Sequence, residues 1–193
     1  MSSPRITPKA ERILETASTL FYDQGIHAVG VDLVAQESGV TKRTLYDRFG
    51  SKEALVIAYL ERREAMWREV LLLELEEHAV PGIDQILAVF HAAKSMHDDL
   101  SKGCSAINAR AEEAADVDGS AVTELVVAQK AWMRELFERL CHEAGFADAA
   151  QLGRQLQLLY DGALVSFGTR AVDDPLKVAS DIAAMLLHAQ RLK

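Results

Sequence analysis

The segment from Val31 to Lys52, VDLVAQESGVTKRTLYDRFGSK, constrains the fold of this chain more than any other. It predicts two short helices joined by a tight turn, because Gly39 stands where a left-handed turn residue is needed. Thr41 is a suitable N-cap for the second helix, at residues 41–49, and Leu45 and Phe49 share its inner side. The segment is therefore expected to form a helix-turn-helix.

The outer side of that second helix carries groups that suit a DNA duplex. Its outward and edge positions are Thr41, Lys42, Arg43, Tyr46, Asp47 and Arg48. A short helix with an apolar back and a basic, hydroxyl-rich front fits a major groove. Arg43 has the geometry to bond a guanine bidentately, whereas Lys42 and Lys52 suit phosphates as point charges.

The net charge of −8, taken alone, argues against a nucleic-acid binder, but the charges are unevenly distributed along the chain. Residues 1–52 hold seven Lys and Arg against six Asp and Glu, and the rest hold fourteen against twenty-three. An acidic body with a locally basic head favours selective DNA binding. An acidic surface that only aids solubility explains the body equally well.

The rest of the chain predicts an all-α fold of about nine helices, since strand-like alternation is absent. The expected helices span residues 8–24, 31–38, 41–49, 51–78, 83–101, 104–115, 121–144, 147–172 and 175–192. Ala79–Gly82 is the clearest boundary. We assign 1–52 to a helix-turn-helix DNA-binding domain, 51–78 to a connecting helix, and 53–193 to a ligand-binding and dimerisation domain.

Targeting and membrane signals are absent from the sequence. The N-terminus lacks a secretory h-region, and Cys104 and Cys141 are expected to be free thiols in a reducing compartment. The longest apolar runs fall far short of the ~20 residues that span a bilayer. We expect a soluble, cytoplasmic protein that needs no cofactor and no membrane.

The last two helices, at residues 147–192, mix leucines with small residues such as Gly153, Gly162 and Gly168. Such faces allow close helix approach, and four of these helices from two chains form a two-fold bundle. The same faces could pack only within one chain. We favour a homodimer, because paired recognition helices match a palindromic site.

The order of these features resembles the TetR/AcrR family of one-component regulators over about residues 7–58. The resemblance is carried by Val34-Ala35, Gly39-Val40-Thr41, Leu45-Tyr46, Phe49 and Lys52. The segment GCSAINARAEE, at 103–113, is similar to one in some members. Gly30 and Leu33 depart from the family pattern, at a helix cap and at a position that is more often polar.

The resemblance implies roles for the head. Tyr46 and Lys52 would contact phosphates, and Thr41, Lys42, Arg43 and Asp47 would lie near base edges or the flanking backbone, with Arg48 serving the backbone. An aromatic wedge between the first and third helices remains an alternative role for Tyr46.

The resemblance also implies an apolar ligand pocket in the body, whose occupation would change the spacing of the two heads. The candidate residues are Met66, Phe90, Met96, Ile107, Asn108, Glu112, Trp132, Phe137, Tyr160 and Phe167. For each apolar candidate, a plain core position is favoured over a ligand contact. Asn108 and Glu112, four apart on one helix, suit a ligand's polar group or a solvated edge.

Enzymatic and metal functions are not favoured by the motifs. The sequence has no Gly-rich phosphate loop, no G-x-S-x-G elbow and no H-E-x-x-H. His91 and His97 are six residues apart, which places them on different sides of a helix and disfavours a shared metal. Cys104, near a helix start, is either a redox switch or an inert buried thiol.

The sequence thus predicts a homodimeric DNA-binding repressor that a small molecule releases from a palindromic operator. An activator or a ligand-independent regulator is the first alternative. A small helical ligand carrier or enzyme that retains this head is the second.

Overall fold

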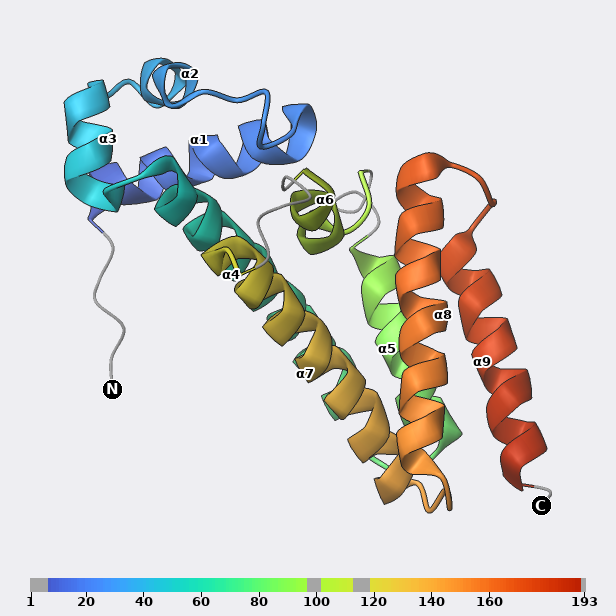
Figure 1. Cartoon of the computed structure of the whole chain (residues 1–193). Coiled ribbons are helices and arrows are strands. Elements are labelled where there is room, and N and C mark those ends of the chain that lie inside the picture. Colours follow the sequence, from blue (N-terminus) through green and yellow to red (C-terminus); the bar gives the residue numbers. More distant parts are fainter. Residues whose placement is uncertain (1–6, 97–101, 113–118, 192–193) are drawn as a thin grey trace. The chain divides into compact units, whose positions relative to one another are not determined.

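The computed structural model describes residues 7–96, 102–112 and 119–191, and in these ranges it contains nine α-helices and no strand (Figure 1). The helices are α1 Pro8–Gln24, α2 Val31–Glu37, α3 Lys42–Phe49, α4 Lys52–Glu77, α5 Ile83–Ser95, α6 Ser105–Glu112, α7 Ala121–Glu143, α8 Ala149–Thr169 and α9 Pro175–Arg191. The predicted all-α fold is confirmed.

Two helices end earlier than the sequence predicted. Helix α5 stops at Ser95, where the amide of Met96 turns back to the carbonyl of Ala93. Helix α8 stops at Thr169, because Arg170 adopts a left-handed conformation with φ 53°. The further residues predicted as helical at 97–101 and 113–115 lie outside the described ranges.

The chain divides into two compact units. The first comprises the chain up to Arg63 together with Ser105–Val126, and the second comprises Glu64–Cys104 and Val127–Lys193. Helices α4 and α7 therefore contribute residues to both units, and α6 belongs to the first. The predicted domain division at residues 52 and 53 stays a prediction.

The core of the first unit is formed by α1, α2, α3 and the beginning of α4. Ile13, Ala17 and Phe21 are buried on one face of α1, as their spacing requires. The rings of Phe21 and Tyr59 meet edge to face with centroids 5.7 Å apart. On the surface of this core the guanidinium of Arg63 lies 4.6 Å from the ring centroid of Tyr22. The buried aromatic pair and this cation–π contact join α4 to α1.

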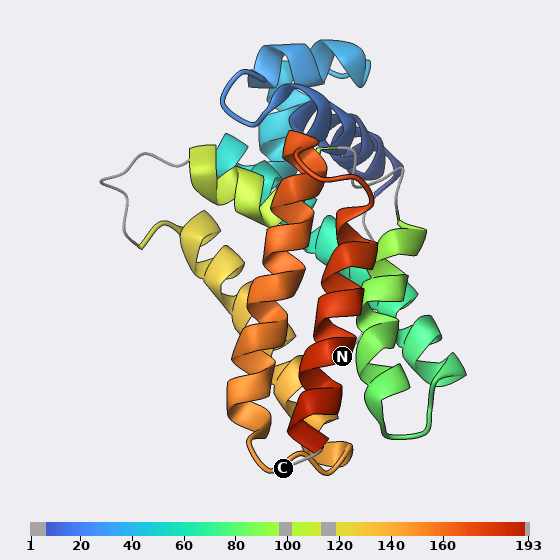
Figure 2. The same ribbon diagram turned by 90° about the vertical axis from the view of Figure 1, so that its right-hand side faces the viewer.

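The second unit has its largest core around α5, which buries eight of its thirteen residues. Figure 2 shows α8 and α9 side by side, and α9 also packs on α5. Helix α8 approaches the backbone of α7 closely at Gly153, where an added Cβ would lie 3.0 Å from the Glu138 amide nitrogen. No helix in the described part of the chain is long and apolar enough to span a membrane.

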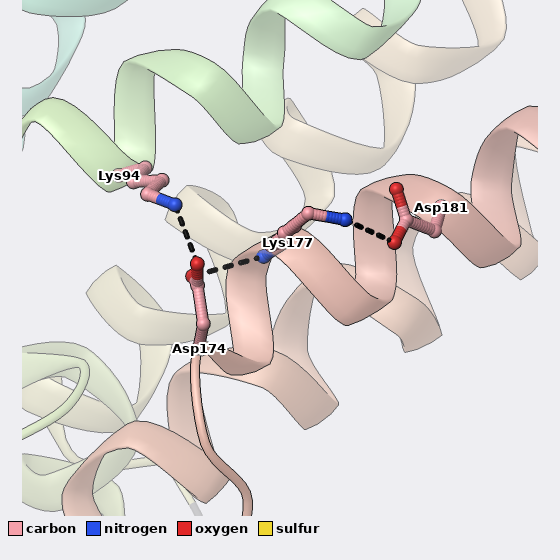
Figure 3. Close-up of polar contacts among 4 residues, drawn as sticks. All are labelled: Lys94, Asp174, Lys177 and Asp181. Carbon is pink, nitrogen blue, oxygen red and sulfur yellow. Dashed lines mark hydrogen bonds and ion pairs between the residues drawn. The ribbon is translucent and has the colours of Figure 1, made fainter.

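One ion pair joins α5 to the residue before α9, and a second lies within the first turns of α9 (Figure 3). Lys94 Nζ lies 2.5 Å from Asp174 Oδ2, and Lys177 Nζ lies 2.6 Å from Asp181 Oδ2. Asp174 also accepts a hydrogen bond from the Lys177 amide at 3.4 Å, so it caps α9. The Lys94 ammonium holds the pKa of Asp174 below its usual value. These groups are exposed, so the pairs position α9 more than they stabilise the fold.

Candidate DNA-binding surface

The turn between α2 and α3 has the geometry that the sequence predicted. Gly39 has φ 65°, and the Val40 amide donates to the carbonyl of Ala35 at 3.0 Å. The buried Ser38 hydroxyl donates to the carbonyl of Val34 at 2.6 Å. The Thr41 hydroxyl accepts a hydrogen bond from the Thr44 amide at 3.1 Å and caps α3. Every polar group named here has a partner, so α3 starts at a fixed place.

Helix α3 has a buried back and an exposed front. Leu45 is fully buried, Phe49 is half-buried, and α3 packs on both α1 and α2. The exposed residues of α3 and its cap are Thr41, Lys42, Arg43, Tyr46, Asp47 and Arg48. These are the six residues of α3 and its cap that the sequence predicted to face DNA. Tyr46 is 41% exposed, which leaves its ring available to a partner.

Two of the three cations on α3 lie close to carboxylates of the same unit. Lys42 Nζ is 2.9 Å from Asp32 Oδ1, and this carboxylate raises the pKa of Lys42. Arg43 Nε is 3.9 Å from Asp47 Oδ2, while 92% of the Arg43 side chain is exposed. Exposed pairs of this kind are weak, so a phosphate or a guanine can replace the carboxylate.

Lys52 occupies a different environment from the α3 cations. Its Nζ donates to the carbonyl of Ile26 at 2.6 Å, in the loop that follows α1. Partial burial lowers the pKa of Lys52, although Glu112 opposes that shift. The ammonium thus joins the start of α4 to the α1–α2 loop, a contact that sequence spacing could not reveal. Its predicted bond to a phosphate stays a prediction.

Glu112, which the sequence placed among the ligand contacts, binds this same loop. Its carboxylate accepts a hydrogen bond from the His27 amide at 2.6 Å. A Cβ added at Gly25, where φ is 91°, would lie 3.3 Å from the carboxylate oxygens. The exposed Glu112 therefore holds the loop between α1 and α2. Asn108, half-buried on the same helix, has a polar or electrostatic partner, and Ile107 is half-buried.

The aromatic ligand candidates of the second unit pack on one another. The rings of Phe90, Phe137 and Tyr160 lie with centroids 5.8 to 6.0 Å apart and are at most 4% exposed. Trp67, which the sequence analysis missed, adds its ring 5.9 Å from Tyr160. Burial raises the pKa of Tyr160 well above its usual value. These residues form the aromatic centre of the core.

The remaining candidates of the second unit are more dispersed. Met66 is 39% exposed and Met96 is buried. The guanidinium of Arg68 lies 3.9 Å from the ring centroid of the half-buried Trp132. Phe167 lines a hollow of about 640 Å³ together with Lys94, Arg170, Val172, Asp173, Asp174 and Pro175.

Cys104 lies beside a half-buried lysine, Lys130, that the sequence analysis did not single out. Lys130 Nζ is 2.6 Å from Asp161 Oδ1 and 3.6 Å from Cys104 Sγ. Burial acts to lower the pKa of Lys130, but Cys104 and Asp161 outweigh it, so the pKa is raised. Burial raises the pKa of the Cys141 thiol to about 12, so that thiol stays protonated at neutral pH.

Comparison with known proteins places the head in a described family. Residues 13–59 match the model of "Bacterial regulatory proteins, tetR family". The chain is 29% identical over 183 residues to the "Uncharacterized HTH-type transcriptional regulator YxaF" of Bacillus subtilis, covering 92% of this chain and 94% of that protein. It is 45% identical over 58 residues to the "HTH-type transcriptional activator FasR" of Mycolicibacterium smegmatis, covering 28% and 26%.

Solved structures agree over nearly the whole length. SCO4454, a TetR-family transcriptional regulator from Streptomyces coelicolor, superposes with a TM-score of 0.77 at 28% identity, covering 94% of this chain and 93% of that one. The reduced form of NemR from E. coli superposes with a TM-score of 0.76 at 21% identity, covering 92% and 95%, and so supports the fold alone.

Proposed function

The chain belongs to the TetR family of bacterial transcriptional regulators and is a DNA-binding regulator, and we propose that it is a homodimeric repressor released from its operator by a small molecule. The observation that carries the proposal is α3, a helix of eight residues with a buried Leu45 and an exposed polar front. A fixed helix of this kind presents its first turns to base edges while flanking cations meet phosphates.

Within this proposal each exposed residue of α3 has a task. Arg43, the most exposed of the paired cations, reads a guanine through its planar fork. Lys42 exchanges Asp32 for a phosphate, and Tyr46 donates its hydroxyl to another. Thr41, Asp47 and Arg48 lie beside the bases and the flanking backbone. Lys52 combines its bond to Ile26 with a phosphate contact.

Support for a homodimer comes from two exposed apolar stripes on α8 and α9. Leu158 and Val165, seven residues apart on α8, are 74% and 47% exposed. Val178, Ile182 and Met185, with helical spacing on α9, are 41%, 41% and 67% exposed. A Cβ added at Gly162, between the α8 pair, would meet nothing within 4 Å in this chain.

Because α8 and α9 pack on each other, their stripes form half of a four-helix bundle that a second copy completes. The two recognition helices of such a dimer read two half-sites about 10–10.5 bp apart, or a multiple of that distance. We therefore expect a palindromic operator.

The proposed effector acts on the second unit. The hollow lined by Phe167 has a volume within the range of small-molecule sites, roughly 300–1,000 Å³. Its lining combines apolar side chains with two cations and two carboxylates, and one of the cations, Lys94, is already paired with Asp174. Such a lining suits a small amphipathic molecule without a large net charge. The packed rings of Phe90, Phe137 and Tyr160 would have to separate to admit a ligand. A ligand that binds there would therefore favour a second conformation in which the core is packed differently.

The test is selection of bound fragments from the source genome by the purified full-length protein, repeated with candidate ligands. The expected result is a palindromic site near a promoter, whose affinity falls steeply with salt and whose occupancy drops with one ligand class. Transcription in vitro from that promoter should fall when the protein is added. A rise in transcript would mean that the protein is an activator and not a repressor. Failure to retain any fragment at low salt would refute the proposal.

A further inference from the structure

Three potential metal ligands converge at the end of α4. Glu74 and His78, one helical turn apart, come from α4 and the residue that follows it, and His91 comes from the middle of α5. One ligand atom from each of the three lies within 4.8 Å of the other two. All three residues belong to the second unit. Glu74 and His78 are half-buried and His91 is exposed, so an ion can reach the cluster from solvent.

The ring of His78 is held by a contact with the backbone of α4. Its Nδ1 lies 3.0 Å from the backbone carbonyl of Glu74 and 3.7 Å from the Glu74 carboxylate. A hydrogen on Nδ1 donated to that carbonyl leaves the Nε2 lone pair free, which is how metal-bound imidazoles are usually held. The His78 and His91 ring centroids are 6.4 Å apart with the planes inclined by 59°.

We propose that Glu74, His78 and His91 bind one divalent first-row transition-metal ion of the zinc type, with water as the fourth ligand. Two imidazoles and a carboxylate form the donor set that such ions take at open sites, whereas Mg²⁺ and Ca²⁺ prefer oxygen alone.

The distances allow this coordination after small side-chain movements. Tetrahedral bonds of about 2.0–2.1 Å place ligand atoms about 3.3 Å apart. The separation of up to 4.8 Å must therefore close by roughly 1.5 Å. The exposed His91 can supply most of that closure by rotation about its side-chain bonds, and the half-buried Glu74 the rest.

An ordinary Glu–His pair on one helix explains only part of this arrangement. Glu74 and His78 suffice for that pair, and His91 adds a second imidazole from another helix. Two protonated imidazoles at this separation repel each other, whereas two neutral rings can share one cation. The sequence analysis paired His91 with His97, which lies outside the described residues. It missed Glu74 and His78, because they come from another part of the sequence.

Cobalt provides the direct probe. The full-length protein, without a histidine tag and dialysed against a chelator, should develop the visible absorption of tetrahedral Co²⁺ at one ion per chain, and Zn²⁺ should displace it. The single variants His91→Ala and Glu74→Gln should each weaken Zn²⁺ binding by about tenfold or more. The proposal would be overturned if both variants bound Zn²⁺ as strongly as the wild type, or if the wild type did not bind micromolar Zn²⁺.

His27→Ala is the control. His27 is exposed, belongs to the first unit and is not in the cluster. It bonds Glu112 through its backbone amide, so the substitution leaves that bond in place. Zn²⁺ should raise the melting temperature of the wild type and of His27→Ala by the same amount, and that of His91→Ala by less. An equal rise in His91→Ala would place the ion elsewhere and refute the site.

Discussion

Helices α3 and α9 both leave one side exposed, but only α9 carries a row of exposed aliphatic side chains. On α3 the exposed residues are charged or carry hydroxyls, and a single fully buried residue, Leu45, anchors the helix. On α9 the exposed face includes Val178, Ile182 and Met185, while six other residues are buried. The difference indicates which partner each face suits: the polar front suits a polyanion, and the apolar stripe suits a second copy of itself.

The largest effect should come from charging the apolar stripes. Ile182→Glu combined with Leu158→Glu places carboxylates at a face that the proposed dimer buries, where an unpaired charge is costly. We expect the dimer dissociation constant to rise by about 1,000-fold, which is about 4 kcal/mol. Analytical ultracentrifugation measures it.

Leu72→Glu is the control for that pair, because Leu72 is 56% exposed but lies on α4 and belongs to neither stripe. It should leave the dimer intact. Dissociation equal in the control and in the double variant would mean that the stripes are not the dimer face.

Arg43→Ala tests whether α3 reads sequence. If Arg43 bonds a guanine, its loss should cost about 1–3 kcal/mol and relax discrimination at one base pair. Binding measured against operators that differ at each position distinguishes the outcomes. Weakening that is uniform over all operators would make Arg43 a phosphate contact.

Tyr46→Ala combined with Lys52→Ala tests backbone contacts. Binding should weaken by about tenfold or more on every sequence, and the slope of log affinity against log salt should fall by about two, because each dimer loses two charges. The melting temperature should be measured in parallel, because Lys52 also binds the Ile26 carbonyl. An unchanged salt slope with a lowered melting temperature would restrict Lys52 to that structural bond.

The smallest effect concerns the carboxylate beside Lys42. Asp32→Asn removes the partner at 2.9 Å and leaves the ammonium free for a phosphate. Affinity for DNA should rise by about twofold to fivefold at low salt. The same change in a Lys42→Met background should have no effect, and a rise there would mean that Asp32 repels the duplex directly.

Short-range features of the head were predictable from the sequence. Gly39, the Thr41 cap and the buried Leu45 follow from relations of three or four residues within one turn. The nine helices followed from periodicity in the same way. The six exposed residues of α3 and its cap were therefore correctly placed on its outer face.

Contacts between distant segments were not predictable. Lys52 meets a carbonyl 26 residues earlier, and Glu112 meets an amide 85 residues earlier. The sequence identified Phe90, Phe137 and Tyr160 as apolar and inward-facing, but whether such rings line a cavity or touch one another depends on how helices pack. Their centroid distances show that the three rings pack on one another.

The bond between Glu112 and the His27 amide has a practical consequence for building chimeric regulators. A designer who transplants residues 7–63 onto a foreign body leaves that amide without its carboxylate. Carrying Ser105–Val126 with the head preserves it, because both segments form one compact unit. The transferable module of this protein is therefore discontinuous in sequence, and an exchange at a single junction would separate its two pieces.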